Sequence, residues 1–331
     1  MLMNLLHFEK ILENEPKYRT SQARKAIFSD LIESWHEATS LPNNIRDLLS
    51  KECPIEIKSK LFISNNKKAV KALIFLSDEQ KIETVLMRKD SRNTVCVSTQ
   101  VGCPMGCKFC ATGDMGFKRN LSASEIIEQI ILFARYLKPQ NEKVTNIVFM
   151  GMGEPFLNYD NVLESIRYLN QKDSLNIGAR RFSISTVGLT DGINRFANEN
   201  LEVNLAISLH APSDEIRSNL MPINNSIPIA ELISSAKNYI RKTRRKVMFE
   251  YLMIDGVNDS PNCAEELSTL LKGMLCMVNL IPYNETDKFK PSSKTNIECF
   301  KNVLLKNKIE VIQRYSFGKD ISAACGQLAT S

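Results

Sequence analysis

Features typical of membrane and exported proteins are missing from this sequence. No run of about 18 apolar residues occurs, so no segment is predicted to span a membrane. The start, MLMNLLHFEKILENEPKYR, has neither a basic segment nor a small-residue cleavage site, which indicates a helix and not a signal peptide. Low-complexity segments and short repeats are also absent. We therefore expect a globular, cytoplasmic protein, for which 43% hydrophobic and 24% charged residues are ordinary values.

An excess of charge of one sign is missing too. A formal net charge of +6 permits a nucleic-acid partner without requiring one. The densest basic run is RKTRRK, from Arg241 to Lys246. Two interpretations of this run stay open: a solvated helix end, where cations suit the helix dipole, or a patch that contacts phosphates.

Cysteine is plentiful, but its pattern argues against a disulfide framework. The nine cysteines are an odd number in a chain that looks cytoplasmic. Four lie among apolar or amphipathic neighbours and are interpreted as structural: Cys53, Cys263, Cys276 and Cys299. The other five indicate metal or thiol chemistry: Cys96, Cys103, Cys107, Cys110 and Cys325.

Two local patterns precede the main body of the chain. Residues 1 to about 60 read as a small helical module, with helices predicted over 5–15, 22–35 and 43–52 and prolines between them. Residues 60–89 contain three β-rich segments with an Asp-Glu turn between the last two, which predicts an antiparallel meander.

A regular alternation of strands and helices fills the remainder. Apolar strands are predicted over 94–101, 146–153, 181–188, 203–211, 246–254 and 276–284, with a last one over 308–316. Amphipathic helices between them include 123–137, 159–170, 230–242 and 263–273. About six strand–helix units predict an α/β fold with a parallel sheet and right-handed crossovers, short of the eight units in a closed barrel.

Polar residues gather where the predicted strands end. They are Cys103 after the first strand, Gly153 and Glu154 after the second, Ser185 in the third, Ser208 and His210 after the fourth, and Asn284 after the sixth. Ligands of such sheets bind at the C-terminal ends of the strands. We therefore expect one site that faces several strand ends.

Three cysteines are spaced CxxxCxxC within GCPMGCKFCATGDMGF, residues 102–117. A structural zinc ion normally takes four protein ligands, and no fourth cysteine or histidine lies nearby. A cubane iron–sulfur cluster also normally takes four thiolates, so three would leave one iron open for chemistry. A zinc knuckle remains the alternative interpretation of this spacing.

The spacing, the aromatic Phe109 before the last cysteine and the partial (βα)6 barrel together resemble the radical S-adenosylmethionine (SAM) superfamily. Further motifs are similar to those of the RlmN/Cfr group of RNA adenine methyltransferases: TVCVSTQVGC, FMGMGEP, SISTVG, ISLHAP, MPIN, VNDS, LIPYN and KDISAACGQL. The similarity runs from about Lys81 to Leu328. The N-terminal helices resemble the small accessory domain of that group more weakly.

The resemblance implies a set of cofactor sites. Cys103, Cys107 and Cys110 would hold a [4Fe–4S] cluster, and two molecules of SAM would be used per turnover. The residues implied to bind SAM are Gly153, Glu154, Ser185, Ser208, Leu209, His210 and Asn284. In this set the glycine permits close approach, and the carboxylate accepts from the ammonium group of the cofactor.

The resemblance also implies a covalent mechanism. One SAM would methylate the thiol of Cys325, a radical from the second would abstract a hydrogen atom from that methyl group, and the thiomethylene radical would add to an adenine carbon. Cys96, seven residues before Cys103 on the same predicted strand, would release the RNA by forming a disulfide with Cys325. Glu83 would accept a proton or position the adenine.

The two branches of this group methylate adenosine 2503 of 23S rRNA at different carbons. RlmN-type members act at C2 and also on adenosine 37 of some tRNAs, whereas Cfr-type members act at C8 and confer antibiotic resistance. Pro155, LIPYN and the later PSS resemble the RlmN type. EPKYRTSQARKAIF, ATGDMGFKRNL and RYSFGKDI resemble the Cfr type, and we favour C2.

The predicted organisation is a helical accessory domain (1–60), a β meander (61–95), the partial barrel (96–315) and a tail with Cys325 (316–331). RNA contact by the accessory domain is a hypothesis. The expected partners are 23S rRNA, tRNA and a reduced flavodoxin-like electron donor, with no membrane and a monomeric protein. Alternatives from other classes are a non-catalytic iron–sulfur or zinc protein that binds RNA, and an activase of a glycyl-radical partner.

Overall fold

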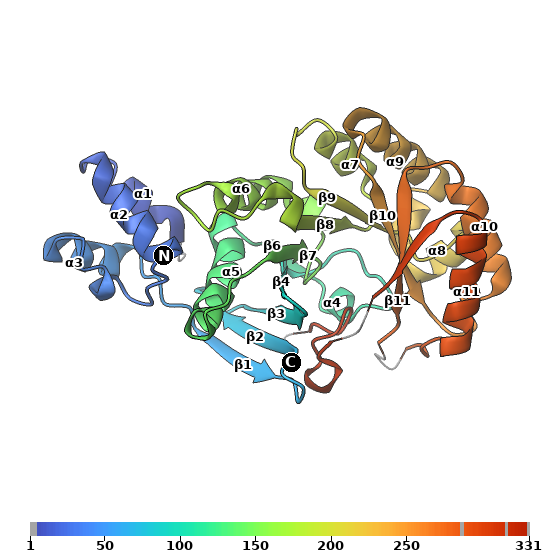
Figure 1. Ribbon diagram of the computed structural model, residues 1–331, viewed down its shortest axis with the longest axis horizontal. Helices are drawn as coiled ribbons and strands as arrows, with labels where there is room; N and C mark the ends of the chain where they lie inside the picture. Colours follow the sequence, from blue (N-terminus) through green and yellow to red (C-terminus); the bar gives the residue numbers. More distant parts are fainter. Residues whose placement is uncertain (1–4, 285–287, 315–316, 330–331) are drawn as a thin grey trace.

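The computed structural model of the chain describes residues 5–284, 288–314 and 317–329. Its N-terminal part is helical and lies at one end of the molecule (Figure 1). The elements there are η1 (Leu5–His7), α1 (Phe8–Ile11), α2 (Lys17–Phe28), η2 (Trp35–Glu37) and α3 (Asn43–Glu52). No helix within the described ranges has the length and apolar character needed to cross a membrane.

The second helix of this module is shorter than predicted, so the prediction of a helix up to residue 35 is wrong. α2 ends at Phe28, and Leu31 turns the chain with a φ of 52°. Ser34 then begins η2 in a capping box. The turn lets the indole N–H of Trp35 donate to the Cys53 carbonyl at 2.6 Å. Burial of Trp35 therefore overrides the helical pattern of the local sequence.

The module packs on α5 (Ala123–Leu137) with the help of two buried charged residues of that helix. The Arg135 guanidinium donates to the carbonyls of Ile32 and Ile55 in the module, the latter at 3.0 Å. Glu128, two turns earlier on α5, is also buried. Burial raises the pKa of Glu128 to about 8 and lowers the pKa of Arg135. The ionisation of Glu128 and Arg135 therefore affects how the module packs on the barrel.

Glu128 is expected to make the protein less stable as the pH rises. Its pKa is raised in the folded state, chiefly by burial, so its contribution to stability is complete below about pH 4.5 and is lost as the pH rises to about 8. Glu128→Gln should remove most of the fall in melting temperature between about pH 5 and pH 9. Thermal unfolding of both proteins checks this, and an equal fall in the variant would contradict it.

The antiparallel meander is confirmed. Its strands are β1 (Ser59–Ile63), β2 (Ala69–Phe75), β3 (Lys81–Lys89) and β4 (Arg92–Val97). Each pairs antiparallel with the next. The register places Lys71, Val85 and Cys96 in one row across β2, β3 and β4, so these side chains share one face of the sheet. Glu83, two residues before Val85, lies on the same face.

Parallel strands continue this sheet from β4 onward, which confirms the α/β class and the partial barrel. They are β7 (Asn146–Phe149), β8 (Phe182–Thr186), β9 (Asn204–Ser208), β10 (Val247–Met253), β11 (Cys276–Pro282) and β12 (Glu310–Gln313). The ten-stranded sheet runs in the order β1-β2-β3-β4-β7-β8-β9-β10-β11-β12. The last two residues predicted for the final strand, 315 and 316, lie outside the described residues.

The predicted strand over 94–101 is wrong in its second half. Two short strands form a separate sheet there: β5 (Gln100–Gly102) and β6 (Phe117–Asn120). The cause is a side chain of α5, because the Gln129 amide accepts from the Ser98 N–H at 2.8 Å and donates to its carbonyl at 2.9 Å. These bonds satisfy backbone groups that a neighbouring strand would otherwise pair. Cys103 therefore lies beyond a different strand from Cys96, contrary to the prediction.

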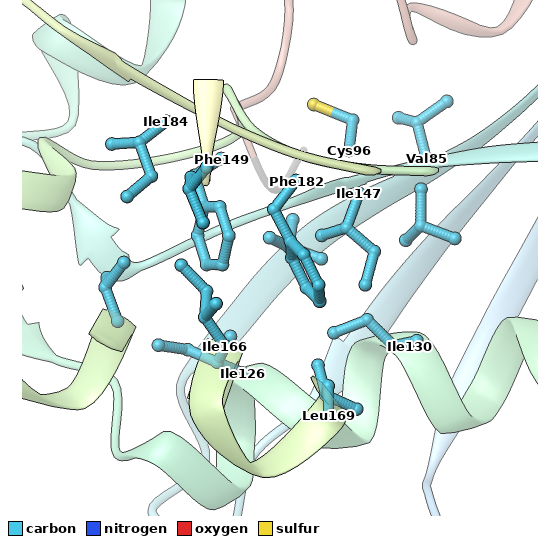
Figure 2. Close-up of a cluster of buried hydrophobic side chains, with 14 of the residues drawn as sticks. Val85, Cys96, Ile126, Ile130, Ile147, Phe149, Ile166, Leu169, Phe182 and Ile184 are labelled. Atoms are coloured by element: carbon cyan, nitrogen blue, oxygen red, sulfur yellow. The ribbon is translucent and has the colours of Figure 1, made fainter. Parts of the chain in front are cut away.

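Helices cover the outer face of the parallel sheet (Figure 1). They are α5, α6 (Tyr159–Asn170), α7 (Thr190–Phe196), α9 (Ile229–Thr243), α10 (Pro261–Leu271) and α11 (Lys294–Lys306). Two short helices, α4 (Ala111–Asp114) and α8 (Asp214–Leu220), lie in the connections that follow β5 and β9. Figure 2 shows Ile126 and Ile130 of α5 beside Leu169 of α6 and Ile147 of β7, whereas Cys96 points away from this cluster. The alternation along the strands thus separates a helix-facing core from an inner face that carries Cys96.

The basic run at the end of α9 mostly bonds within the protein. The side chains of Arg241 and Arg245 donate to asparagine side chains at 2.9 Å, and Lys246 forms an ion pair with Glu310. The run leads directly into the start of β10, whereas the predicted site lies at the ends of the strands. These contacts favour the interpretation as a helix end.

Candidate active site

A pocket lies where the parallel strands end, at the place where the sequence predicted one shared site. The predicted residues that line it are Cys96, Cys103, Cys107, Cys110, Gly153, Glu154, Ser185, Ser208, His210, Asn284 and Cys325. Two predicted residues do not line it: Leu209 is fully buried, and Glu83 contacts the C-terminal segment instead. The fold therefore gathers almost the whole predicted set around one space.

The three clustered cysteines lie on the loop that joins β5 to α4. The Cys103 N–H donates to the Gly116 carbonyl at 3.0 Å, and the Lys108 N–H donates to the Leu220 carbonyl at 2.9 Å. Gly102 leads into the loop with a φ of 73°, and a Cβ there would lie 1.8 Å from the Gly116 oxygen. Only glycine fits this position, so the loop wraps tightly on itself.

The arrangement of the three thiols suits an iron–sulfur cluster. Within the described ranges, no three His, Cys, Asp or Glu side chains converge on a point where one metal ion could bind. The thiolates of a cluster bind different irons, so they need only surround a common space, and Cys103, Cys107 and Cys110 line one pocket. Burial raises the pKa of Cys103 to about 12 and also raises that of Cys107. Bound metal would be needed to keep these groups as thiolates.

Gly153 and Glu154 follow β7 at the edge of the pocket. Gly153 has a φ of 99°, and a Cβ there would lie 2.6 Å from the Cβ of Gln100, so the backbone approaches closely. The buried Glu154 carboxylate accepts from the N–H groups of Phe156 and Val187 at 3.0 and 2.8 Å. Burial raises the pKa of Glu154 to about 7 although both N–H groups oppose the shift. Each oxygen keeps a lone pair with which it can accept from an ammonium group.

Glu250 on β10 is a buried carboxylate in the same pocket that the sequence reasoning missed. It accepts from the hydroxyls of Ser185 and Ser208 at 2.6 and 3.5 Å, both through Oε2. Two acceptors of this pocket, Glu250 Oε1 and Asn284 Oδ1, are buried without a hydrogen-bond partner among the described residues, although Glu250 Oε1 lies 3.6 Å from the Arg314 guanidinium in an ion pair. Such acceptors suit a ligand with hydroxyl and amino donors, as a nucleoside has. A lone acidic residue within the apolar run KVMFEYLMI is the signal that could have revealed Glu250.

His210 lies in the left-handed region with a φ of 59° and is neutral. Its Nδ1 accepts from the Leu252 N–H at 3.1 Å, which places the proton on Nε2. Burial and, to a smaller extent, the charge of Arg217 lower the pKa of His210 to about 3. The ring packs edge-on against Phe109 of the cysteine loop, with centroids 4.9 Å apart. His210 can therefore donate a hydrogen bond, but it does not exchange protons near neutral pH.

Arg217 on α8 is a second buried residue that the sequence reasoning missed. Its guanidinium donates to the carbonyls of Val187, Ser208 and Leu209 at 2.6, 3.3 and 3.2 Å. It also donates to Asn224 Oδ1 at 2.9 Å. Burial lowers the pKa of Arg217 to about 10, which leaves it charged at neutral pH. Arg217 thus ties the loops after β8 and β9, including the backbone of the buried Leu209, to α8.

Cys96 and Cys325 lie far apart in the sequence but line the same pocket. Burial raises their pKa values to about 12 and about 11, and the nearby Arg314 guanidinium opposes both shifts. Cys325 remains reachable by solvent, since the residue is exposed although protein surrounds its thiol. Both thiols are therefore neutral at physiological pH and must lose a proton to react.

The C-terminal segment, residues 322–329, is held across this region by the cysteine loop and β3. Its Gly326 carbonyl accepts from the Ala111 N–H at 2.8 Å. The Cys325 carbonyl accepts from the Asn284 amide at 3.2 Å. At its end the Ala329 N–H donates to Glu83 Oε2 at 3.0 Å. Figure 1 shows this end of the chain beside β2 and β3.

Comparison with known proteins finds likeness along nearly the whole chain. The family model for the radical SAM superfamily matches residues 97–265. The chain is 44% identical over 334 residues to the "Probable dual-specificity RNA methyltransferase RlmN" of Dictyoglomus turgidum, which covers 98% of this chain and 96% of that protein. It is 42% identical over 326 residues to the "Ribosomal RNA large subunit methyltransferase N" of Nitrosopumilus maritimus, with 95% and 93% covered. The crystal structure of a radical SAM methyltransferase from Sphaerobacter thermophilus matches with a TM-score of 0.95 and 43% identity, over 99% of this chain and 98% of that one.

Proposed function

Because this chain belongs to the RlmN family of radical SAM RNA methyltransferases, we propose that it methylates C2 of adenosine 2503 in 23S rRNA and also adenosine 37 of tRNA. The family inferred from the motifs, and with it the enzyme class, is confirmed. The observation that carries the finer proposal is the placement of Cys96 and Cys325 in one pocket with the three clustered cysteines.

The cofactors proposed are a [4Fe–4S] cluster on Cys103, Cys107 and Cys110, and SAM. Bound there, the cluster and SAM would supply the methyl group and the one-electron chemistry that a closed-shell adenine carbon requires. The carboxylate of Glu154 would bind the ammonium group of SAM. Two buried acceptors without a hydrogen-bond partner, Glu250 Oε1 and Asn284 Oδ1, would accept from its nucleoside part.

Cys325 would carry the methyl carbon, and Cys96 would release the product. After the carbon is bonded to both the Cys325 sulfur and the adenine, the Cys96 thiolate attacks that sulfur. The S–S bond forms as the C–S bond breaks, and the electron pair stays on the carbon, which takes up a proton to become a methyl group. The step balances because the two sulfur atoms together lose two electrons on forming the disulfide, and the carbon gains two electrons on becoming a methyl group. Glu83 would act at the adenine as proton acceptor or positioning group.

Nucleoside mass spectrometry of 23S rRNA tests the proposal. The protein is expressed in cells without their own enzyme for this position, and Cys325→Ala serves as the matched control. We expect 2-methyladenosine from the wild type and none from the control. A product of 8-methyladenosine would contradict C2 and make Pro155 a misleading guide; no methyladenosine at all would contradict the proposed function.

The remaining features of the proposal concern organisation and partners. We propose the division into an accessory domain (1–60), a meander (61–95), a barrel (96–315) and a tail (316–331), with RNA contact by the accessory domain. Arg135 of the barrel donates to the carbonyls of Ile32 and Ile55 in this domain. The domain is therefore fixed to the barrel and would orient RNA toward the pocket. A flavodoxin-like electron donor, a monomeric state and a cytoplasmic location complete the proposal.

A further inference from the structure

Lys71, in the middle of β2, is a buried lysine with no role in the function proposed above. Its Nζ lies 2.8 Å from Glu83 Oε1, and the two side chains are only 7% and 1% exposed. It also lies 5.4 Å from the centroid of the Phe62 ring and donates to the Ser322 carbonyl at 3.4 Å. Lysine is almost never buried unless it is paired, and a buried ion pair contributes little net stability. The burial of Lys71 beside the Glu83 carboxylate therefore needs an explanation other than stability.

Both oxygens of the Glu83 carboxylate have a partner. Oε1 faces the Lys71 ammonium, and Oε2 accepts from the Ala329 N–H at 3.0 Å. The Glu83 carbonyl accepts from Ser98 Oγ at 2.6 Å, which fixes the backbone that carries the side chain. The ammonium group and the amide N–H thus place one donor group beside each oxygen of the carboxylate.

The pair lies directly beside the segment that carries Cys325. Lys71 and Glu83 share the face of the sheet on which Cys96 lies. Lys71 contacts the segment before Cys325, at Ser322, and Glu83 contacts it after Cys325, at Ala329. The ion pair therefore contacts the chain on both sides of Cys325.

The Ala329 N–H occupies the Glu83 oxygen that a substrate would need. Adenine presents an exocyclic amino group, which is also an N–H donor. The Glu83 side chain is only 1% exposed and contacts this segment, so a base can reach the carboxylate only if Ala329 moves away. Lys71 then holds the carboxylate in place while one donor replaces the other.

We propose that Lys71 is a positioning residue, which holds the Glu83 carboxylate aimed at the place where an adenine N–H would replace that of Ala329. The inference rests on the proposed function, because it requires an adenine substrate. Lys71 acts on the RNA step through Glu83 and takes no part in methylation of Cys325.

The test separates methylation of Cys325 from the RNA step. Lys71→Met keeps the length of the side chain without its charge, Lys71→Arg restores the charge, and Lys68→Met changes an exposed lysine three residues away as the control. Peptide mass spectrometry of the purified proteins measures methyl-Cys325. In the Cys96→Ala background, the yield of covalent RNA–protein adduct measures the RNA step.

Lys71→Met should keep methyl-Cys325 and lower the rate of adduct formation by about 10²-fold, as expected when a catalytic carboxylate loses its correct position. Lys71→Arg should recover part of this loss, and Lys68→Met should show none. Adduct formation at the wild-type rate in Lys71→Met would overturn the proposal. Loss of methyl-Cys325 together with the adduct would also overturn it, because that result describes a purely structural role.

A double-variant cycle keeps the test decisive if Lys71→Met folds poorly. Removing both members of a buried ion pair leaves no unpaired charge, so the Lys71→Met/Glu83→Gln protein should fold. Its adduct formation should equal that of Glu83→Gln alone, because Lys71 acts through Glu83. A further loss in the double variant would contradict the inference. Failure of the proposed function itself would look different, since the wild type would then form no methyladenosine.

Discussion

Cys325→Ala is expected to leave RNA unmethylated, whereas Cys96→Ala is expected to accumulate RNA bound covalently to the protein. The two cysteines line the same pocket, but their positions in the chain suit opposite roles. Cys325 is exposed and so can approach a substrate, whereas Cys96 is buried and fixed in β4 of the ten-stranded sheet. Loss of the first removes the carrier, and loss of the second removes only the release step.

The adduct can be identified by its chemistry. In Cys96→Ala the bond between RNA and Cys325 is a thioether, so it should survive denaturation and thiol reductants but lose its RNA to nuclease. Cys299→Ala, on the exposed part of α11, is the matched control and should behave like the wild type. Normal turnover by Cys96→Ala, or an adduct that a reductant cleaves, would show that the assigned roles are wrong.

Arg217→Met is expected to destabilise the protein more than any other substitution considered. The guanidinium donates to four backbone carbonyls and one amide oxygen, and methionine fills similar space without a single donor. Each buried acceptor left without a partner costs about 1–3 kcal/mol, which relief of the buried charge only partly offsets. We therefore expect a loss of about 3 kcal/mol or more in the free energy of unfolding.

The same substitution should also loosen the site. Arg217 connects α8 to the carbonyls of Ser208 and Leu209, and the end of α8 binds the cysteine loop through Lys108. Urea unfolding of the apoprotein and iron content after reconstitution measure the two effects. Arg180→Met, which removes one exposed ion pair, should change neither. An unchanged urea midpoint in Arg217→Met would refute the stabilising role of this network.

Most of the fold could be predicted from the sequence because it depends on local patterns. The period of apolar residues distinguishes strands from helices over stretches such as 81–89 and 123–137, where prediction and structure agree. The spacing of Cys103, Cys107 and Cys110 fixes their nearness whatever the rest of the chain does. Strand order then brings Glu154, Ser185 and Asn284 to the same edge, because parallel strands end together.

Where local prediction failed, a distant side chain had decided the structure. The strand through Ser98 breaks because Gln129, on a helix that follows later, takes its backbone bonds. α2 stops early because Trp35 is buried against Cys53. In both places, hydrogen bonds of regular secondary structure are replaced by hydrogen bonds to residues far along the chain. Nothing in the neighbouring residues indicates this replacement.

The sequence by itself determined which chemical groups this protein has and on which elements they lie; only the tertiary structure decided what each group faces. Lys71 and Glu83 are polar positions in alternating strands, and such a pattern sets the face of a side chain but not what covers that face. The cover comes from Ala329, 246 residues beyond Glu83. Arg217 and Glu250 are likewise ordinary charged residues until folding buries them. Burial makes an unpaired polar atom costly, so partners brought from far along the chain give these groups their roles.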